Sequence, residues 1–170
     1  KENKINEAKE LLVKRFEGHI DNATSYMARS AYETEFDSST TVFKSNGKKR
    51  IVVMLHCFFD SPHIYRDMIY PDFYEWLDET LSLAVKSNCD FYIKPHPNGL
   101  PENESIIEEF KNKYSANNII FIDKNISNSQ LLTEGFDAAI TVYGTVIHEF
   151  AYHDIPVICA GDNPHSAYDF

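Results

Sequence analysis

The segment that decides the fold of this protein reads DAAITVYGTVIHEFAYHDIPVICAG, from Asp137 to Gly161. Two short apolar runs, 137–142 and 155–161, flank a stretch, 145–154, in which apolar residues recur at helical spacing. Gly144 lies between the first run and the helical stretch, where the absence of a side chain allows a tight turn. A strand, a helix and a second strand in this order predict a parallel βαβ unit.

The same alternation extends toward the N-terminus, with apolar runs that predict strands and helical periodicity between them. Three further strands and three further helices are expected at 50–58, 71–87, 90–95, 102–115, 117–123 and 127–136. Five strands separated by helices favour the α/β class, with a mostly parallel, Rossmann-like sheet and helices on both of its faces. We therefore expect a Rossmann-like domain at 48–170.

The first part of the chain has a different pattern. Residues 5–16 carry apolar side chains at helical spacing, and 22–32 predict a second helix. Residues 35–50 indicate a polar linker with a turn at 46–47. We therefore separate a helical segment and linker, 1–47, from the Rossmann-like domain. Because the chain begins without methionine and stops directly after a loop signal, we expect a fragment of a longer protein.

Composition restricts the classes of function. The chain is 43% hydrophobic and 25% charged, and no apolar run approaches the ~20 residues that span a bilayer. The formal net charge of -10 argues against nucleic-acid binding, because proteins of that kind neutralise phosphates with a basic surface. Cys57, Cys89 and Cys159 lie in or beside apolar runs without metal-ligand spacing, which favours reduced thiols in a cytoplasmic protein.

Polar and charged residues collect where the predicted strands end. In an open parallel sheet, ligands bind outside the carboxyl ends of the strands, near the point where the strand order switches. We therefore expect one ligand site at this edge of the sheet. The candidate residues are His56, Asp60, His63, Lys94, His96, Pro97, Gly144, Thr145, Glu149, His165 and Ser166.

The stretch YIKPHPNG, 92–99, is the first part of this site. Pro95 and Pro97 hold His96 rigidly beside Lys94 at the end of a predicted strand. A histidine in this place would hydrogen-bond a phosphate and, if protonated, offset its charge. The alternative interpretation is a partly buried or surface histidine without a ligand.

The stretch YGTVIHE is the second part of the site. Gly144 and Thr145 open a predicted helix whose first N–H groups favour an anion such as a phosphate. The Thr145 hydroxyl can contribute, and the Glu149 carboxylate one turn later can accept both hydroxyls of a ribose. The alternative is that Thr145 is a simple N-cap and Glu149 an acid of the first turn. Together with Lys94 and His96, this stretch predicts a two-part phosphate clamp.

Other site chemistry has weaker support. His56, Asp60 and His63 suggest a metal by residue type, but their spacing in a proline-containing loop is only weakly metal-like. We expect them to border the ligand cleft, together with His165 and Ser166, and we expect no metal and no cofactor. Dinucleotide, P-loop and esterase motifs are absent from the sequence.

The stretches HCFFDSPH, FYEWL, IKPHPN and YGTVIHEFAYHDIPVICAGDNPHSAY resemble the capsule polysaccharide biosynthesis proteins, a bacterial family that includes Kdo transferases. The resemblance extends from Lys49 to the end of the chain. It implies the C-terminal, nucleotide-sugar-binding half of a glycosyltransferase with the GT-B fold. It also implies a CMP-sugar donor such as CMP-Kdo and a saccharide or lipid-linked saccharide acceptor. A cytoplasmic location follows, with peripheral association at the inner face of the membrane as a further expectation.

The resemblance assigns roles to individual residues. In related enzymes that use CMP-sugars, an HP motif and a Ser/Thr motif hold the nucleotide phosphate, and these positions are His96-Pro97 and Thr145 here. The Glu149 position commonly binds the ribose in GT-B folds. Teichoic-acid polymerases that use CDP-glycerol share the two motifs, but they usually have a serine pair where this chain has Gly144-Thr145.

Three functions therefore stay open at the sequence level. The first is a glycosyltransferase donor lobe, the second a polyol-phosphate transferase, and the third a non-catalytic interaction module of the same fold. A general base for the acceptor hydroxyl is expected outside this chain. We therefore expect the chain to bind nucleotide without catalysing transfer alone.

Overall fold

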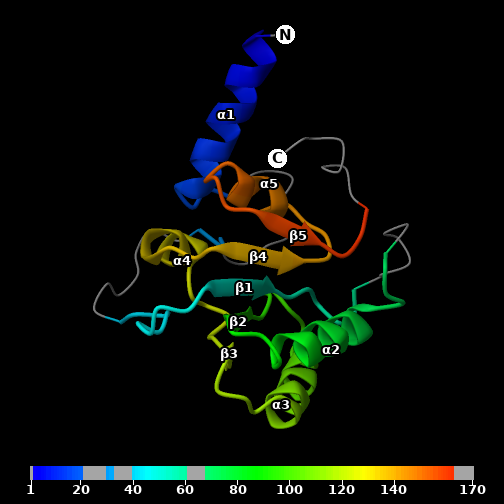
Figure 1. Cartoon of the computed structure of the whole chain (residues 1–170). Coiled ribbons are helices and arrows are strands. Elements are labelled where there is room, and N and C mark those ends of the chain that lie inside the picture. Colours follow the sequence, from blue (N-terminus) through cyan, green and yellow to red (C-terminus); the bar gives the residue numbers. More distant parts are fainter. Residues whose placement is uncertain (1, 21–29, 33–39, 61–67, 163–170) are drawn as a thin grey trace.

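The computed structural model describes residues 2–20, 30–32, 40–60 and 68–162. Its strands are β1 (Arg50–Met54), β2 (Asp90–Lys94), β3 (Ile119–Phe121), β4 (Ala138–Thr141) and β5 (Val157–Cys159). Its helices are α1 (Glu2–Phe16), α2 (Phe73–Ala84), α3 (Asn103–Lys113), α4 (Asn128–Glu134) and α5 (Val146–Ala151). The strands form one five-stranded, all-parallel sheet, which confirms the expected α/β, Rossmann-like architecture (Figure 1).

The strand order in the sheet is β3-β2-β1-β4-β5. The chain first builds outward from β1 through β2 to β3, and then returns past β1 to place β4 and β5 on the other side. Because β1 and β4 are neighbours although β2 and β3 lie between them in sequence, the order switches at this pair. The carboxyl ends of β1 and β4 therefore flank the place where open α/β sheets bind ligands.

Successive strand residues point to opposite faces, so each strand contributes to two apolar layers. Val53 and Ile93 pack in the layer that α2 and α3 cover, whereas Val52 and Tyr92 pack in the layer that α4 and α5 cover. The buried helix residues of these layers are Phe73, Trp76, Leu77, Leu81, Ala84, Phe110, Leu131 and Phe150. Strands with both faces covered explain the nearly continuous apolar runs in the sequence.

Two helices begin at side-chain caps. The Asp72 carboxylate accepts a hydrogen bond from the Glu75 amide at 2.8 Å at the start of α2. The Ser127 hydroxyl accepts one from the Ser129 amide at 3.1 Å at the start of α4. Each cap satisfies one amide that the helix itself leaves without a partner.

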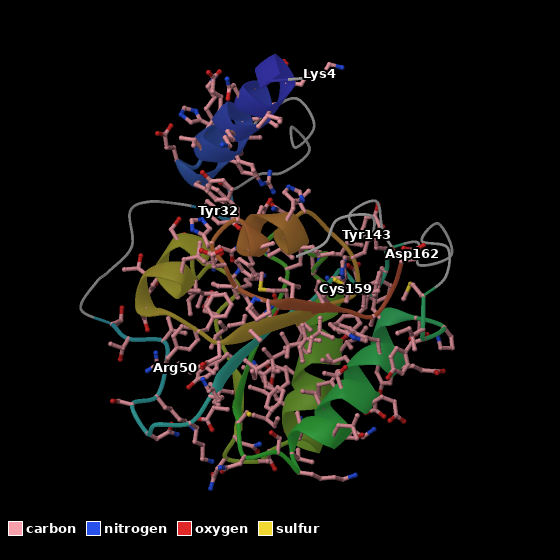
Figure 2. All side chains as sticks on the ribbon, turned by 45° about the horizontal axis from the view of Figure 1, so that its top comes forward. Lys4, Tyr32, Arg50, Tyr143, Cys159 and Asp162 are labelled. Atoms are coloured by element: carbon pink, nitrogen blue, oxygen red, sulfur yellow. The ribbon has the colours of Figure 1, made fainter. Side chains whose placement is uncertain are left out.

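The N-terminal helix extends away from the sheet and meets the rest of the molecule at its last turn (Figure 1). Phe16 packs against Tyr152 and His153, which directly follow α5, with ring centroids 5.4 and 4.6 Å apart. Phe16 also contacts Tyr32, which lies between α1 and the sheet domain (Figure 2). Most of the helix expected at 22–32 lies outside the described residues.

Part of the expected linker belongs to the core. Phe43 is 5% exposed, and its ring packs edge-on against Tyr92 of β2 at 4.7 Å. Cys57, Cys89 and Cys159, all within the described ranges, form no disulfide. Across the residues that the structure describes, no helix is both long enough and apolar enough to cross a membrane.

Candidate functional site

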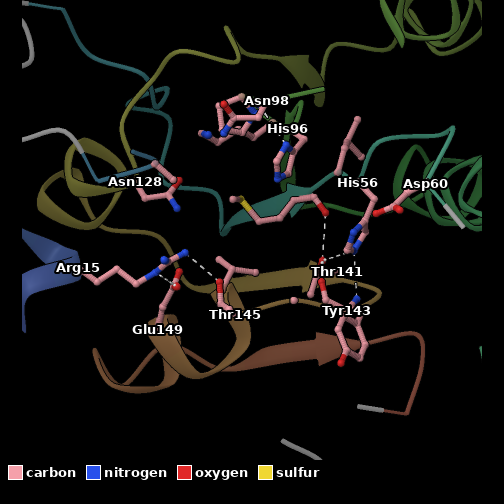
Figure 3. A pocket seen from close by; sticks show the side chains of 17 residues that line it. Arg15, His56, Asp60, His96, Asn98, Asn128, Thr141, Tyr143, Thr145 and Glu149 are labelled. Atoms are coloured by element: carbon pink, nitrogen blue, oxygen red, sulfur yellow. Dashed lines mark hydrogen bonds and ion pairs between the residues drawn. The ribbon is translucent and has the colours of Figure 1, made fainter. Parts of the chain in front are cut away.

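A pocket of about 310 Å³ opens at the carboxyl ends of β1, β2 and β4 (Figure 3). This volume lies at the lower end of the roughly 300–1,000 Å³ that small-molecule sites occupy. Three of the predicted residues, His63, His165 and Ser166, lie outside the described residues. The other predicted residues all line the pocket, namely His56, Asp60, Lys94, His96, Pro97, Gly144, Thr145 and Glu149.

Lys94 brings a positive charge to the wall of the pocket. It is the last residue of β2 and only 1% exposed, and its Nζ lies 3.5 Å from the Lys124 carbonyl oxygen. That distance is long for a hydrogen bond. Because a positive charge attracts an anion most strongly where little water screens it, Lys94 favours an anionic group in this pocket.

His96 is oriented by the turn that follows it. Its Nδ1 accepts a hydrogen bond from the Asn98 amide at 3.1 Å, and its carbonyl accepts one from the Gly99 amide at 3.2 Å. The neutral ring therefore carries its proton on Nε2, which can donate to a ligand. Burial lowers the pKa of His96, and the Lys94 ammonium lowers it further against a small opposing effect of Asp60. The structure thus favours a neutral donor over the protonated ring that could offset phosphate charge.

His56 connects the loop after β1 to the loop after β4. Its ring stacks on Phe73, with the centroids 4.5 Å apart, and its Nε2 accepts a hydrogen bond from the Tyr143 amide at 3.1 Å. Burial lowers the pKa of His56 to about 4, with a smaller contribution from His96. A neutral histidine that accepts a backbone amide holds the two loops side by side. Among the described residues, no group of three His, Cys, Asp or Glu side chains gathers as a metal site.

Gly144 allows the turn from β4 into α5. Its φ of +124° lies in a region that residues with a side chain rarely adopt. Thr145 follows at the N-cap position, but its backbone is helical and its side chain caps no amide. Thr145 therefore has the N-cap position and Glu149 the first-turn position of the alternative interpretation, but the Thr145 side chain makes no capping bond. The Thr145 hydroxyl instead accepts a hydrogen bond from Arg15 Nη2 at 3.0 Å.

The start of α5 offers less to an anion than expected. The helix has only six residues, and the Ile147 amide already donates to the Gly144 carbonyl at 3.3 Å. The dipole of such a short helix is small, because few peptide units contribute to it. Side chains rather than the helix end supply most of the polar groups of this pocket.

Glu149 is engaged by residues from the N-terminal segment. It is 1% exposed, its Oε1 accepts a hydrogen bond from Arg15 Nε, and its Oε2 accepts one from the Tyr32 hydroxyl at 2.8 Å. Burial raises the pKa of Tyr32 well above its usual value, and Glu149 raises it further, so Tyr32 stays protonated. The carboxylate expected to bind ribose hydroxyls thus already has a donor on each oxygen.

Several polar residues of the pocket were not predicted from the sequence. The side chains of Arg15 and Asn128 form one end of the pocket, and Thr141 and Tyr143 lie at the other (Figure 3). Arg15 is a basic residue in the last turn of α1, where such residues are common, so its type gave no signal. Asn128 is the first residue of α4, and asparagine is common at the start of a helix, so its type gave no signal either.

The charges of the pocket are unevenly placed. Arg15 and Glu149 form an ion pair at one end, and Asp60 is exposed at the other. Lys94 places a buried positive charge in the wall of the same pocket. A protein with a formal net charge of -10 therefore has a local site that can receive an anion.

Comparisons of this chain with protein families, with curated proteins and with solved structures give no match.

Proposed function

We propose that this pocket binds the nucleotide phosphate of an activated sugar. The chain would then be the donor-binding lobe of a bacterial glycosyltransferase that builds a capsule or other surface polysaccharide. The observation that carries this proposal is the meeting of Lys94, His96 and Thr145 in one pocket at the switch point of the sheet. The resemblance of the sequence to capsule polysaccharide biosynthesis proteins supports the same ligand class.

In this proposal, the pocket stabilises the leaving group of a sugar transfer. The bond between the sugar carbon and the phosphate oxygen breaks, and the acceptor hydroxyl oxygen forms the new bond to that carbon. The departing phosphate gains negative charge, which the Lys94 ammonium and the His96 Nε2–H are placed to stabilise. The acceptor hydroxyl gives its proton to a general base, which we expect outside this chain.

The non-catalytic alternative predicts that Lys94 and His96 face separate environments. Both residues line the same pocket, which favours a ligand site over a module whose histidine is only structural. The polyol-phosphate alternative uses the same phosphate contacts, so it differs only in the group that the nucleotide carries. Binding of CDP-glycerol in preference to CMP-sugars would favour it.

Calorimetric titration of the 170-residue chain with CMP, CDP and UDP tests the proposal. We expect binding of at least one nucleotide, and a loss on the order of ten-fold in affinity for the His96→Ala variant. His19→Ala is the matched control, because the His19 side chain is 67% exposed and does not line the pocket. Absence of binding to all three nucleotides, or equal affinity after His96→Ala, would count decisively against the proposal.

The same proposal predicts the sugar acceptor and the cellular location of the protein. A saccharide or lipid-linked saccharide would receive the sugar, and a lipid-linked acceptor would bring the full-length protein to the inner face of the membrane. Co-sedimentation of the full-length protein with vesicles that contain a lipid-linked acceptor tests this part.

A further inference from the structure

Asn128, one of the residues that line the pocket, has a buried hydrogen-bond acceptor. The residue is 2% exposed and lines the pocket, and its Oδ1 accepts no hydrogen bond from the residues that the structure describes. Buried polar side-chain atoms nearly always have a partner, and each exception calls for an explanation. Asn128 lies at the same end of the pocket as Arg15 and Glu149 (Figure 3).

The orientation of the Asn128 amide follows from its neighbours. The Tyr32 hydroxyl donates its proton to Glu149 Oε2, because a carboxylate can only accept. The Tyr32 oxygen is then left as an acceptor, and its partner is the Asn128 side chain. Only the Asn128 Nδ2 can donate to it, so a reversed amide would place two acceptors against each other. The Oδ1 is therefore the atom that lacks a protein donor.

The backbone also holds Asn128 in place. Its amide donates to the Ala31 carbonyl oxygen at 2.7 Å, and Ser127, the preceding residue, caps α4. The residue is thus attached to the 30–32 segment through both its backbone and its side chain. An acceptor held this firmly cannot reach a distant donor by a change of rotamer alone, whereas a donor on a molecule bound in the pocket could satisfy it.

We propose that Asn128 Oδ1 accepts a hydrogen bond from a neutral O–H or N–H donor of the bound ligand, and that it selects ligands that carry this donor. The inference rests on the proposed function, in which the ligand is a nucleotide. The candidate donors are then the ribose hydroxyls and an amino group of the base. Glu149, which was expected to bind the ribose, has a protein donor on each of its oxygens, whereas Asn128 has an acceptor to offer.

The wild-type chain tests this inference without any substitution. Calorimetry compares CMP with 2′-deoxy-CMP, with 3′-deoxy-CMP and with UMP, which carries an oxygen in place of the base amino group. We expect one of the three analogues to bind on the order of ten-fold more weakly than CMP, and the identity of that analogue names the donor. Equal affinities for all four ligands would overturn the inference.

The Asn128→Leu variant checks that Asn128 is the residue responsible. Leucine has the branched shape of asparagine but neither its acceptor nor its donor, so the variant is expected to bind CMP and the discriminated analogue alike. A general loss of packing would weaken all four ligands equally and leave the preference intact. Asn125→Leu, at an exposed position outside the pocket, is the control and should keep the wild-type preference.

The outcomes separate this inference from the proposed function. If the wild-type chain binds none of CMP, CDP and UDP, the proposed function fails and the role of Asn128 fails with it. If the chain binds nucleotide but does not distinguish the four ligands, only the role of Asn128 is wrong. If Asn128→Leu does not fold, equal affinities of the wild-type chain for the four ligands would still overturn the inference, and Asn128→Ala replaces the leucine variant in the test for the responsible residue.

Discussion

Arg15 near the end of α1 and Glu149 in α5 form an ion pair, although 134 positions separate them in the sequence. The pair lies in the wall of the candidate site, where Tyr32 donates to the same carboxylate and Thr145 accepts from the same guanidinium. The N-terminal segment is therefore a structural part of the pocket. Its contacts determine which polar groups of α5 are available to a ligand.

Replacement of Arg15 by methionine should destabilise the fold. The variant keeps much of the apolar side-chain volume but leaves the buried Glu149 carboxylate without its cation. Loss of one partner from a buried pair typically costs about 3 kcal/mol or more in the free energy of unfolding. Urea denaturation of wild type and variant measures the difference.

A double-mutant cycle isolates the contribution of the pair. Arg15→Met combined with Glu149→Gln should lose less stability than the sum of the two single changes, because the second change removes the buried charge. Lys14→Met, on an exposed neighbour in the same helix, should change stability by no more than about 0.5 kcal/mol. If the double variant loses the sum of the two single losses in the free energy of unfolding, the ion pair itself does not stabilise the fold.

Stability should fall at acidic pH because of His56. The pKa of the His56 imidazole is about 4 in the folded state and about 6.5 in the unfolded state. Between these two pH values the unfolded state therefore binds more protons than the folded state. The free energy of unfolding is therefore highest above about pH 6.5 and decreases as the pH falls toward 4. The two pKa values correspond to a loss of roughly 3 kcal/mol at pH values below both. The lowered pKa of His96 acts in the same direction.

The contribution of His56 is measured by denaturation at a series of pH values. His56→Gln should show a shallower decrease than wild type, because one titrating group is gone. His19→Gln should follow the wild-type curve, since His19 is exposed. A His56→Gln curve parallel to that of wild type would place the acid sensitivity elsewhere.

His96 should act as a neutral donor toward a bound nucleotide. Glutamine can place an N–H close to the position of the histidine Nε2, so His96→Gln is expected to retain more affinity than His96→Ala. The affinity difference between wild type and His96→Ala should also stay nearly constant from about pH 6.5 to about pH 8. Calorimetry across this range measures it. A difference that disappears at the higher pH would indicate that the protonated ring is the binding form.

Gly144→Ala should lower both stability and nucleotide affinity. The added Cβ would meet only His56 Cε1, at an ordinary contact distance of 3.9 Å, so the effect comes from the φ of +124°. Strain of this kind costs on the order of 1–3 kcal/mol. Gly135→Ala is the matched control, with a φ of +79°, open space around its Cβ and no place in the pocket. It should lose stability without losing affinity, and denaturation with calorimetry separates the two effects.

The fold could be predicted because its signals are local. Apolar runs marked every strand, and helical spacing marked α2 to α5. The observed strands and helices are shorter than the sequence ranges predicted for them. An apolar run continues beyond the end of a strand wherever the following loop is also buried. At Phe43 the prediction was wrong in a different way. Its polar neighbours in the sequence indicated a linker, but its ring packs on Tyr92 of β2.

The candidate site could be predicted only in part. The rule that ligands bind at the carboxyl ends of parallel strands brought together Lys94, His96, Thr145 and Glu149, and the structure places all four around one pocket. Arg15 and Asn128 were missed, because each acquires its significance from a segment far away in the sequence. No local pattern distinguishes an arginine that reaches a buried carboxylate from one that faces solvent.

The sequence by itself determined the α/β class and the gathering of polar residues at one edge of the sheet, because periodicity and turn residues act over a few positions of the chain. Only the tertiary structure decided that β1 and β4 are neighbours, that His56 and His96 favour their neutral forms, and that Glu149 is engaged while Asn128 Oδ1 lacks a donor among the described residues. These properties depend on burial, on distances between charges and on competition for hydrogen bonds. All three are set by which segments meet in space.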